Sequence, residues 1–275
     1  MHVKPYYTPF KPYHVLEALM KQTAKLLGNR FFFWGFAAGA IIGAAVGTAV
    51  TRSYSFNPVD PSSEVGVTDA FHRVYHNNWW NRTVLNTYWL GVQTMQCPLD
   101  MWVMQEIMYE TRPDVVIETG TRLGGSALYF ASIFDLLGRG RVISIDIRDY
   151  PGKPKHNRVT YLVGSSVSEG ILKAVASLIE PGERVLVFLD SDHAMAHVLR
   201  EMELYARFIG QGQYLIVSDT HLNGHPIFME PLHRGPGPME ALDIFLKNNP
   251  AFASDRNREK YGLTFNPRGF LKRER

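Results

Sequence analysis

The sequence predicts an α/β protein whose mainly parallel sheet is flanked by helices. Short runs of β-branched and apolar residues, such as 114–118 and 184–190, recur along the second half of the chain. Such runs are typical of strands that are covered on both faces. Longer stretches with helical spacing separate them, and strands that alternate with helices imply a parallel sheet.

The composition fits one large folded domain with an appendage. Of the 275 residues, 45% are hydrophobic and 20% are charged, as in globular proteins. The formal net charge is only +3, so the chain offers no general surface for a polyanion, and we recognise no nucleic-acid-binding module. Cys97 is the only cysteine, which excludes an intrachain disulfide and a cysteine-based metal cluster.

The first 52 residues carry an apolar segment that is typical of a membrane helix. Phe31–Val50 contains no charge, and its length matches the roughly 20 residues that a helix needs to cross a bilayer. Every fourth residue from Gly35 to Gly47 is a glycine, a pattern by which membrane helices pack closely and which could join two copies of the chain. The preceding residues 15–27 would suit a helix on a membrane surface. The alternative for 15–27 is a helix that packs on the main domain, and the alternative for Phe31–Val50 is a buried core helix rich in Gly and Ala.

Residues 53–98 are expected to form a linker and a cap. Thr51–Asp69 is polar with two prolines, whereas Ala70–Cys97 is rich in Trp and Tyr, as expected at the entrance of a site. His72 and His76 would share one face of a helix. They lack a third metal ligand nearby, so we expect surface or packing roles for them.

Residues 99–275 are expected to form the main domain, starting with a helix over 99–111 that ends before Pro113. Two short extended runs near the C-terminus, 263–266 and 270–271, could pair antiparallel at the sheet edge. The remaining elements follow the alternating pattern, with strands at 114–118, 141–146, 159–163, 184–190 and 213–218 and helices near 126–137, 168–179, 194–208 and 238–248.

The first strand leads into a glycine-rich turn with the spacing E-x-G-x-x-x-G-G-S from Glu118 to Ser126. Gly120 permits a backbone conformation that a Cβ would disfavour, and Gly124-Gly125 allow another group to approach the chain. Ser126 is the expected N-cap of the next helix. The spacing differs from G-x-G-x-x-G, which argues against a pyrophosphate loop. Glu118 ends its strand where open α/β sheets bind ligands.

Acidic residues end three further strands at the same edge. Asp146, followed by Ile147 and Arg148, lies where an acid accepts hydrogen bonds from ribose hydroxyls. Asp190 and Asp219 end adjacent strands, and two close carboxylates repel each other unless a cation or a proton lies between them. Their hard oxygen ligands favour Mg²⁺. The alternative is a structural acid pair held by Arg or by backbone amides.

A set of motifs, taken in order, resembles the cephalosporin hydroxylase/rhamnosyl O-methyltransferase family. The similarity covers about residues 70–272 and includes a closing run, Leu263-Thr-Phe-Asn-Pro-Arg-Gly269. The other motifs are Glu118-x-Gly120-x-x-x-Gly124-Gly125-Ser126, Asp146-Ile-Arg148, Gly164-Ser-Ser, Leu189-Asp-Ser-Asp-His193, Asp219-Thr-x-x-Asn223-Gly-His225-Pro and Gly235-Pro-Gly-Pro-Met-Glu-Ala.

The resemblance implies the Rossmann-like fold of class I S-adenosylmethionine (SAM) methyltransferases, in which the loop glycines make room for the amino-acid part of SAM. It implies a metal site at Asp190, Asp219 and Thr220. It also implies catalytic roles for His193 as general base and for Asp192. The implied SAM-binding set is Glu118, Gly120, Thr121, Gly124, Gly125, Ser126, Asp146, Ile147, Arg148, Ser165 and Asp190.

Several histidines remain as alternatives to His193. His197, four residues further on, could orient His193 but is more simply expected to pack. Three more follow the fifth strand, in a loop expected to form a lid over the acceptor: His221, His225 and His233. Ser218 departs from the family pattern, which often has Glu there, and this loss would weaken the metal site.

The implied function is a SAM-dependent O-methyltransferase that acts on a hydroxyl of a sugar, glycolipid or secondary metabolite. The implied cofactors are SAM and Mg²⁺. The alternatives are a hydroxylase-associated protein and a non-catalytic SAM-binding scaffold on the membrane, which Ser218 would favour. We expect membrane association with the catalytic domain on the cytoplasmic side. The positive charges before residue 31 place the N-terminus there too, so an interfacial or re-entrant hairpin, or an inverted span, would be needed.

Overall fold

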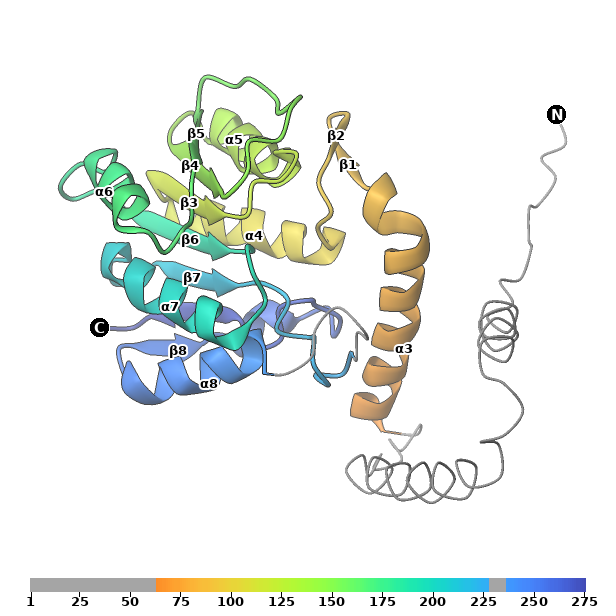
Figure 1. Cartoon of the computed structure of the whole chain (residues 1–275). Coiled ribbons are helices and arrows are strands. Elements are labelled where there is room, and N and C mark those ends of the chain that lie inside the picture. The colour runs from red at the N-terminus through yellow and green to blue at the C-terminus, as the bar shows by residue number, and fades with distance from the viewer. Residues whose placement is uncertain (1–62, 228–235) are drawn as a thin grey trace, which may run out of the picture. The chain divides into compact units, whose positions relative to one another are not determined.

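The computed structural model describes residues 63–227 and 236–275, and it confirms the α/β class with a mainly parallel sheet. The sheet has seven strands in the order β5-β4-β3-β6-β7-β9-β8 (Figure 1). The first five of these strands run parallel to one another. They are β3 (Val115–Thr119), β4 (Arg141–Asp146), β5 (Val159–Val163), β6 (Val185–Leu189) and β7 (Tyr214–Val217).

Two antiparallel strands close one edge of the sheet. β9 (Phe270–Arg273) pairs antiparallel with β7, and β8 (Phe252–Ser254) pairs antiparallel with β9. An antiparallel edge at 270–271 is therefore confirmed, but the strand predicted at 263–266 is wrong. The hydroxyl of Thr264 and the amide of Phe265 donate to the buried carboxylate of Asp100, so a side chain takes the hydrogen bonds that a neighbouring strand would receive.

Helices cover both faces of the sheet (Figure 1). Successive residues of each strand point to opposite faces, which explains why β3 and β6 are buried along their whole length. One core joins a sheet face to α4 (Pro98–Thr111) and α5 (Gly125–Leu137). The other joins the opposite face to α6 (Glu169–Ser177), α7 (Met195–Tyr205) and α8 (Pro238–Asn248). A single turn of 3-10 helix, Ala206–Phe208, follows α7.

The cap expected before the main domain begins with a helix, α3 (Glu64–Asn78), beside the ends of the strands (Figure 1). The linker prediction is wrong from residue 64 onward, because the hydroxyl of Ser63 accepts the amide of Gly66 and caps this helix. Short elements lead on to α4: η1 (Trp79–Thr83), η2 (Val84–Asn86), β1 (Tyr88–Trp89) and β2 (Val92–Gln93).

The start of α5 differs from the prediction that Ser126 caps it. The N-cap is Gly124, whose φ of 79° is in the left-handed region that favours glycine, and Ser126 lies inside the first helical turn. Its hydroxyl instead lies close to the buried carboxyl of Glu118 and lowers the pKa of that group.

Phe31–Val50 lies outside the described residues, so its assignment as a membrane helix stays a prediction. In the part of the chain that the structure does describe, every helix is too short or too polar to span a bilayer.

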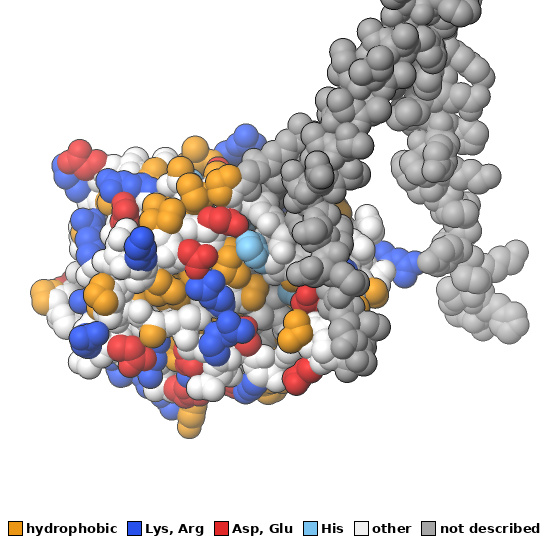
Figure 2. All heavy atoms as spheres, turned by 90° about the horizontal axis from the view of Figure 1, so that it is seen from below, with side chains coloured by type: hydrophobic (Ala, Val, Ile, Leu, Met, Phe, Trp, Pro, Cys, Tyr) orange, Lys and Arg blue, Asp and Glu red, His pale blue; other side chains and the backbone are white. Residues whose placement is uncertain are grey.

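Charges of both signs are interspersed on the face shown in Figure 2. Apolar side chains lie between them, and neither Lys and Arg nor Asp and Glu form a continuous field there. This distribution agrees with the small net charge of +3 and gives that face no strong attraction for a polyanion.

Candidate functional site

A cavity of about 540 Å³ opens at the carboxyl ends of the parallel strands. Its volume lies within the range of about 300–1,000 Å³ that is usual for small-molecule sites. β3 lies between β4 and β6, so the chain turns to opposite sides of the sheet at this point. Open α/β sheets bind ligands at such a switch point. The walls come from the loops after β3, β4, β6 and β7, from α3 with η1, and from segment 93–96.

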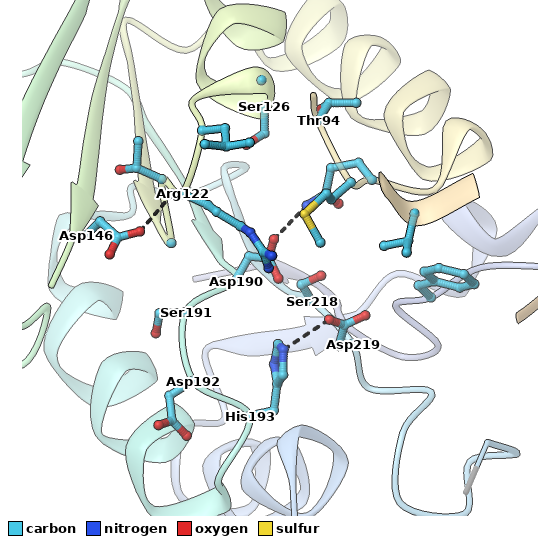
Figure 3. Close-up of a pocket in the computed structure, with 18 of the residues that line it drawn as sticks. Thr94, Arg122, Ser126, Asp146, Asp190, Ser191, Asp192, His193, Ser218 and Asp219 are labelled. Atoms are coloured by element: carbon cyan, nitrogen blue, oxygen red, sulfur yellow. Dashed lines mark hydrogen bonds and ion pairs between the residues drawn. The ribbon is translucent and has the colours of Figure 1, made fainter. Parts of the chain in front are cut away.

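Asp146 lines the cavity at the end of β4, where the sequence predicts contact with a ribose. One carboxylate oxygen accepts the amide of Arg122 at 2.7 Å, and the other accepts the amide of Arg148 at 2.9 Å. These two backbone donors fix the orientation of the carboxylate. Ile147 and Arg148 line the cavity as well, and the side chain of Arg122 extends into it (Figure 3).

Glu118 is fully buried and is not among the residues that line the cavity, so its predicted contact with the cofactor stays a prediction. Its carboxyl is buried, and burial raises its pKa to about 7, although hydrogen bonds from the hydroxyls of Ser126 and Ser144 act in the opposite direction. The hydroxyl of Ser144 also lies 2.6 Å from that of Thr121. Glu118 therefore anchors the turn that carries Thr121, which does line the cavity.

The glycines of the turn make room for the protein chain itself. A Cβ on Gly120 would lie 2.0 Å from the carbonyl oxygen of Asp190, and one on Gly125 would lie 2.2 Å from that of Gln93. A Cβ on Gly124 would meet the Tyr161 hydroxyl at 2.9 Å. The expected close approach of another group is confirmed, and here this group belongs to the protein; the room for the amino-acid part of SAM stays a prediction. The backbone of Gly120 and Gly125 nevertheless lines the cavity, whereas Gly124 does not.

Asp190, His193 and Asp219 form a cluster on the cavity wall, which we call the acid cluster (Figure 3). One ligand atom from each residue lies within 4.8 Å of the others. Nε2 of His193 is 3.3 Å from a carboxylate oxygen of Asp219. The two carboxylates are the hard oxygen ligands that Mg²⁺ prefers, and the imidazole of His193 lies beside them.

Two amide side chains that the sequence analysis missed hold the acid cluster in place. The Gln96 amide donates to Asp190 at 2.6 Å, and the side-chain oxygen of Asn266 accepts the backbone amide of Asp219 at 3.2 Å. Asp219 has a φ of 57°, a strained value for a residue with a Cβ, so this hydrogen bond helps to hold the turn. Both partners are distant in sequence. Asn266 lies in the closing run 263–269, whereas no motif marks Gln96.

Other predicted residues have different surroundings. Thr220, predicted as a metal ligand, does not line the cavity, because its hydroxyl donates to the carbonyl of Pro267 at 2.7 Å. Asp192 lines the cavity, but one of its oxygens accepts the amide of Ala194 and holds the start of α7. Ser165 lines the cavity as expected. Ser218 hydrogen-bonds to Asp190, so it supports an acid of the cluster.

Most of the other histidines named in the sequence analysis make contacts that do not involve the acid cluster. His197 lies 3.2 Å from the Ser166 hydroxyl and 3.4 Å from Glu201, which raises its pKa. His225 pairs with Glu240 at 2.8 Å. His221 and the two cap histidines, His72 and His76, are buried together, which confirms packing for the cap pair and excludes surface positions. His233 and the middle of the predicted lid, residues 228–235, lie outside the described residues.

The pKa values of Asp190 and Asp219 are both raised to about 7, chiefly by burial. Repulsion from Asp219 also raises the pKa of Asp190. Both carboxyls have an ordinary pKa of 3.8, so between pH 4 and 7 the folded state binds protons that the unfolded state has lost. In the absence of a cation, the pair therefore stabilises the fold at low pH, and this contribution is lost as the pH rises through 7.

We expect the free energy of unfolding of the metal-free protein to fall between pH 4 and 7 more steeply than that of Asp219→Asn. Other buried carboxyls, among them Asp100 and Glu118, have raised pKa values too, so the difference between the two proteins isolates the pair. Urea unfolding at a series of pH values measures it. Identical slopes would show that the pair does not titrate as described.

The chain resembles known methyltransferases over most of its length. The family model for rhamnosyl O-methyltransferase/CmcI matches residues 81–274. The rhamnosyl O-methyltransferase of Mycobacterium leprae (strain TN) is 36% identical over 216 residues, which cover 76% of this chain and 91% of that protein. The protein of the same name from Mycobacterium tuberculosis (strain ATCC 25618 / H37Rv) is 38% identical over 214 residues, covering 74% and 84%.

Solved structures show the same fold. The apo structure of CmcI aligns with a TM-score of 0.55 at 18% identity and covers 72% of this chain and 84% of that chain. CmcI with Mg and SAM aligns with a TM-score of 0.54 at 20% identity, with the same coverage. These likenesses support the methyltransferase architecture of the described sheet and helices.

Proposed function

The chain belongs to the rhamnosyl O-methyltransferase/CmcI family and is a SAM-dependent O-methyltransferase, and we propose that its acceptor is a hydroxyl group of a sugar or glycolipid. This proposal depends on one observation: the acid cluster lies on the wall of a cavity that is also lined by Asp146, the acid expected to bind a ribose. A nucleoside-bearing donor and a hydroxyl acceptor would meet there.

The residues around Asp146 fit SAM. Its carboxylate, oriented by two backbone amides, can accept hydrogen bonds from both ribose hydroxyls. The backbone of Gly120 and Thr121 borders the same space, and Ser165 offers a hydroxyl from the loop after β5. Bound SAM supplies a methyl group on a positively charged sulfur, which leaves without needing a proton. The protein therefore has to position the two reactants and remove the proton of the acceptor.

Asp190 and Asp219, with His193 beside them, would hold Mg²⁺. A divalent cation there would lower the pKa of the acceptor hydroxyl. Two carboxylates and one imidazole differ from the two-histidine, one-carboxylate set of non-haem iron hydroxylases, so the acid cluster favours the transferase over the hydroxylase alternative.

His193 is assigned as the general base that takes the acceptor proton. Its Nε2 lies 3.3 Å from Asp219, and a carboxylate at this distance stabilises the imidazolium that proton transfer creates. The membrane tether is a further proposal, which rests on the apolar segment Phe31–Val50. The cytoplasmic location of the catalytic domain is another, which rests on its need for SAM.

His193→Gln is expected to lower kcat by roughly 100-fold to 10,000-fold, the usual contribution of a general base. The amide keeps a neutral polar group but cannot take a proton, so the pH dependence of kcat should change while SAM affinity is retained. Titration calorimetry with Mg²⁺ separates a base from a ligand, since a ligand would also lower the affinity for the cation. An unchanged pH–rate profile would move the base to another residue.

The function itself is tested by incubating the full chain with SAM, Mg²⁺ and para-nitrophenyl rhamnoside. Mass spectrometry should detect one added methyl group on the sugar, and chelation of the cation should suppress the product. A panel of other glycosides and secondary metabolites with free hydroxyls extends the search. If SAM binds and none of these acceptors is methylated, the sugar assignment is wrong.

A further inference from the structure

His76 and His221 form a hydrogen-bonded pair on the cavity wall. Nδ1 of His76 lies 3.0 Å from Nε2 of His221, and both residues line the cavity. His76 comes from α3 and His221 from the loop after β7, so the pair joins the cap to the sheet. The reaction described above uses neither residue.

The acceptors around His221 determine where the protons of this pair lie. Nδ1 of His221 is 3.0 Å from the carbonyl oxygen of Phe265 and 3.5 Å from a carboxylate oxygen of Asp219. An amide carbonyl only accepts hydrogen bonds, so Nδ1 must carry the hydrogen. In the neutral ring Nε2 is then an acceptor, and the hydrogen between the two rings belongs to Nδ1 of His76.

This arrangement leaves a lone pair on Nε2 of His76. Burial lowers the pKa of His76, which agrees with a neutral ring. Among the described residues, Nε2 of the neighbouring His72 is one of the fully buried polar atoms that have no hydrogen-bond partner. Nε2 of His76 does not belong to that group. His72 stacks on His221 but does not line the cavity. His76 is therefore the ring of this group that can offer an acceptor nitrogen to a ligand.

The surroundings of His76 suit a sugar. Trp79 and Trp80, one turn further along the cap, also line the cavity, and their rings can cover the apolar face of a pyranose. Hydroxyls at the ring edge donate hydrogen bonds, and a fixed acceptor among aromatic groups selects for a donor at one position.

We propose that His76 determines acceptor specificity, with its Nε2 accepting a hydrogen bond from an acceptor hydroxyl other than the one that is methylated. His221 is a positioning residue, because it fixes the tautomer of His76. The inference rests on the proposed function and adds a requirement for a second hydroxyl. We assign a binding role to His76, and not a catalytic one, because the acid cluster already binds and deprotonates the reacting hydroxyl in the proposed mechanism.

The test combines a variant with a set of substrates. In His76→Asn the side-chain amide nitrogen replaces Nδ1 and can still donate to His221, but the acceptor at Nε2 is gone. We expect KM for para-nitrophenyl rhamnoside to rise roughly 10-fold or more, with kcat and the Kd of SAM changed less than about twofold. His72→Phe is the matched control, since it keeps an aromatic ring in the stack and should retain the KM of the native chain.

Monodeoxy analogues of the rhamnoside identify the hydroxyl. The native enzyme should lose roughly 10-fold in kcat/KM with one analogue whose missing hydroxyl is not the methylated one, and His76→Asn should lose nothing further with that analogue. Equal kcat/KM values for all such analogues with the native enzyme would overturn the inference, even if the variant failed to fold. If His76→Asn raised KM by the same factor for every analogue, this result would overturn the inference as well. If the native enzyme methylates no glycoside, the proposed function fails and the inference fails with it.

Discussion

Asp219→Asn is expected to lower kcat for methyl transfer by roughly 1,000-fold, since a catalytic cation contributes several kcal/mol. Asp219 supplies a carboxylate to the acid cluster and lies 3.3 Å from His193, so its loss affects both the cation and the proposed base. The amide has almost the same shape, and the backbone hydrogen bond to Asn266 can remain. SAM affinity should change little, because the contacts assigned to the ribose lie at Asp146. Single-turnover rates and calorimetric titration with SAM and Mg²⁺ measure the two effects.

Asp135→Asn provides the control for this experiment. It removes the same charge from the exposed end of α5, where Asp135 pairs with Arg158 at 2.6 Å, away from the residues that line the cavity. It should leave the rate and the affinity for Mg²⁺ unchanged. Normal transfer by Asp219→Asn, or a rate that does not depend on added Mg²⁺ in the native chain, would rule out the role of the cation.

The fold was predictable because its signals are local. A short run of apolar residues, such as 185–189, is enough to predict a buried strand. The alternation of such strands with helices then predicts a parallel sheet. Asp190 and Asp219 could be placed together for the same reason, since adjacent parallel strands bring their carboxyl ends to one edge.

Residues that act across long sequence separations could not be predicted. Gln96 reaches Asp190 across 94 positions, and Asp100 binds Phe265 across 165. The buried carboxylate of Asp100 also explains why the apolar run 263–266 is a loop, although its residues have strand-like character. The His76–His221 pair depends on the same loop, because the carbonyl of Phe265 sets its tautomer.

The glycine-rich turn shows a different limit of what a sequence can predict. A glycine signals that some group approaches the backbone, but it does not say which group. At Gly125 the group is segment 93–94 of the same chain, with the carbonyl oxygen of Gln93 at 2.2 Å and Cα of Thr94 at 2.5 Å from the position of an added Cβ. Both neighbours are backbone atoms, so a change of rotamer cannot relieve the contact.

Gly125→Ala is therefore expected to lower the free energy of unfolding by about 1–3 kcal/mol, the usual cost of overpacking. Alanine favours a helix over glycine by up to about 1 kcal/mol, but Gly125 is the first residue of α5, where this gain is smallest. The steric term should dominate. Segment 93–96 must shift, and it carries Gln96, which holds Asp190. Affinity for Mg²⁺ should fall along with stability, and urea unfolding and calorimetry measure the two changes.

Gly170→Ala is the matched control, because Gly170 also lies in the first turn of a helix, α6, and an added Cβ there would meet no atom within 4 Å. It should stabilise the protein slightly, by well under about 1 kcal/mol because Gly170 also lies at the start of its helix, and leave the affinity for Mg²⁺ unchanged. Opposite signs for the two substitutions would assign the loss at Gly125 to the contact with segment 93–94, since the chemical change is the same. If Gly125→Ala were as stable as the native chain with normal affinity for Mg²⁺, that segment would not be needed to position the acid cluster.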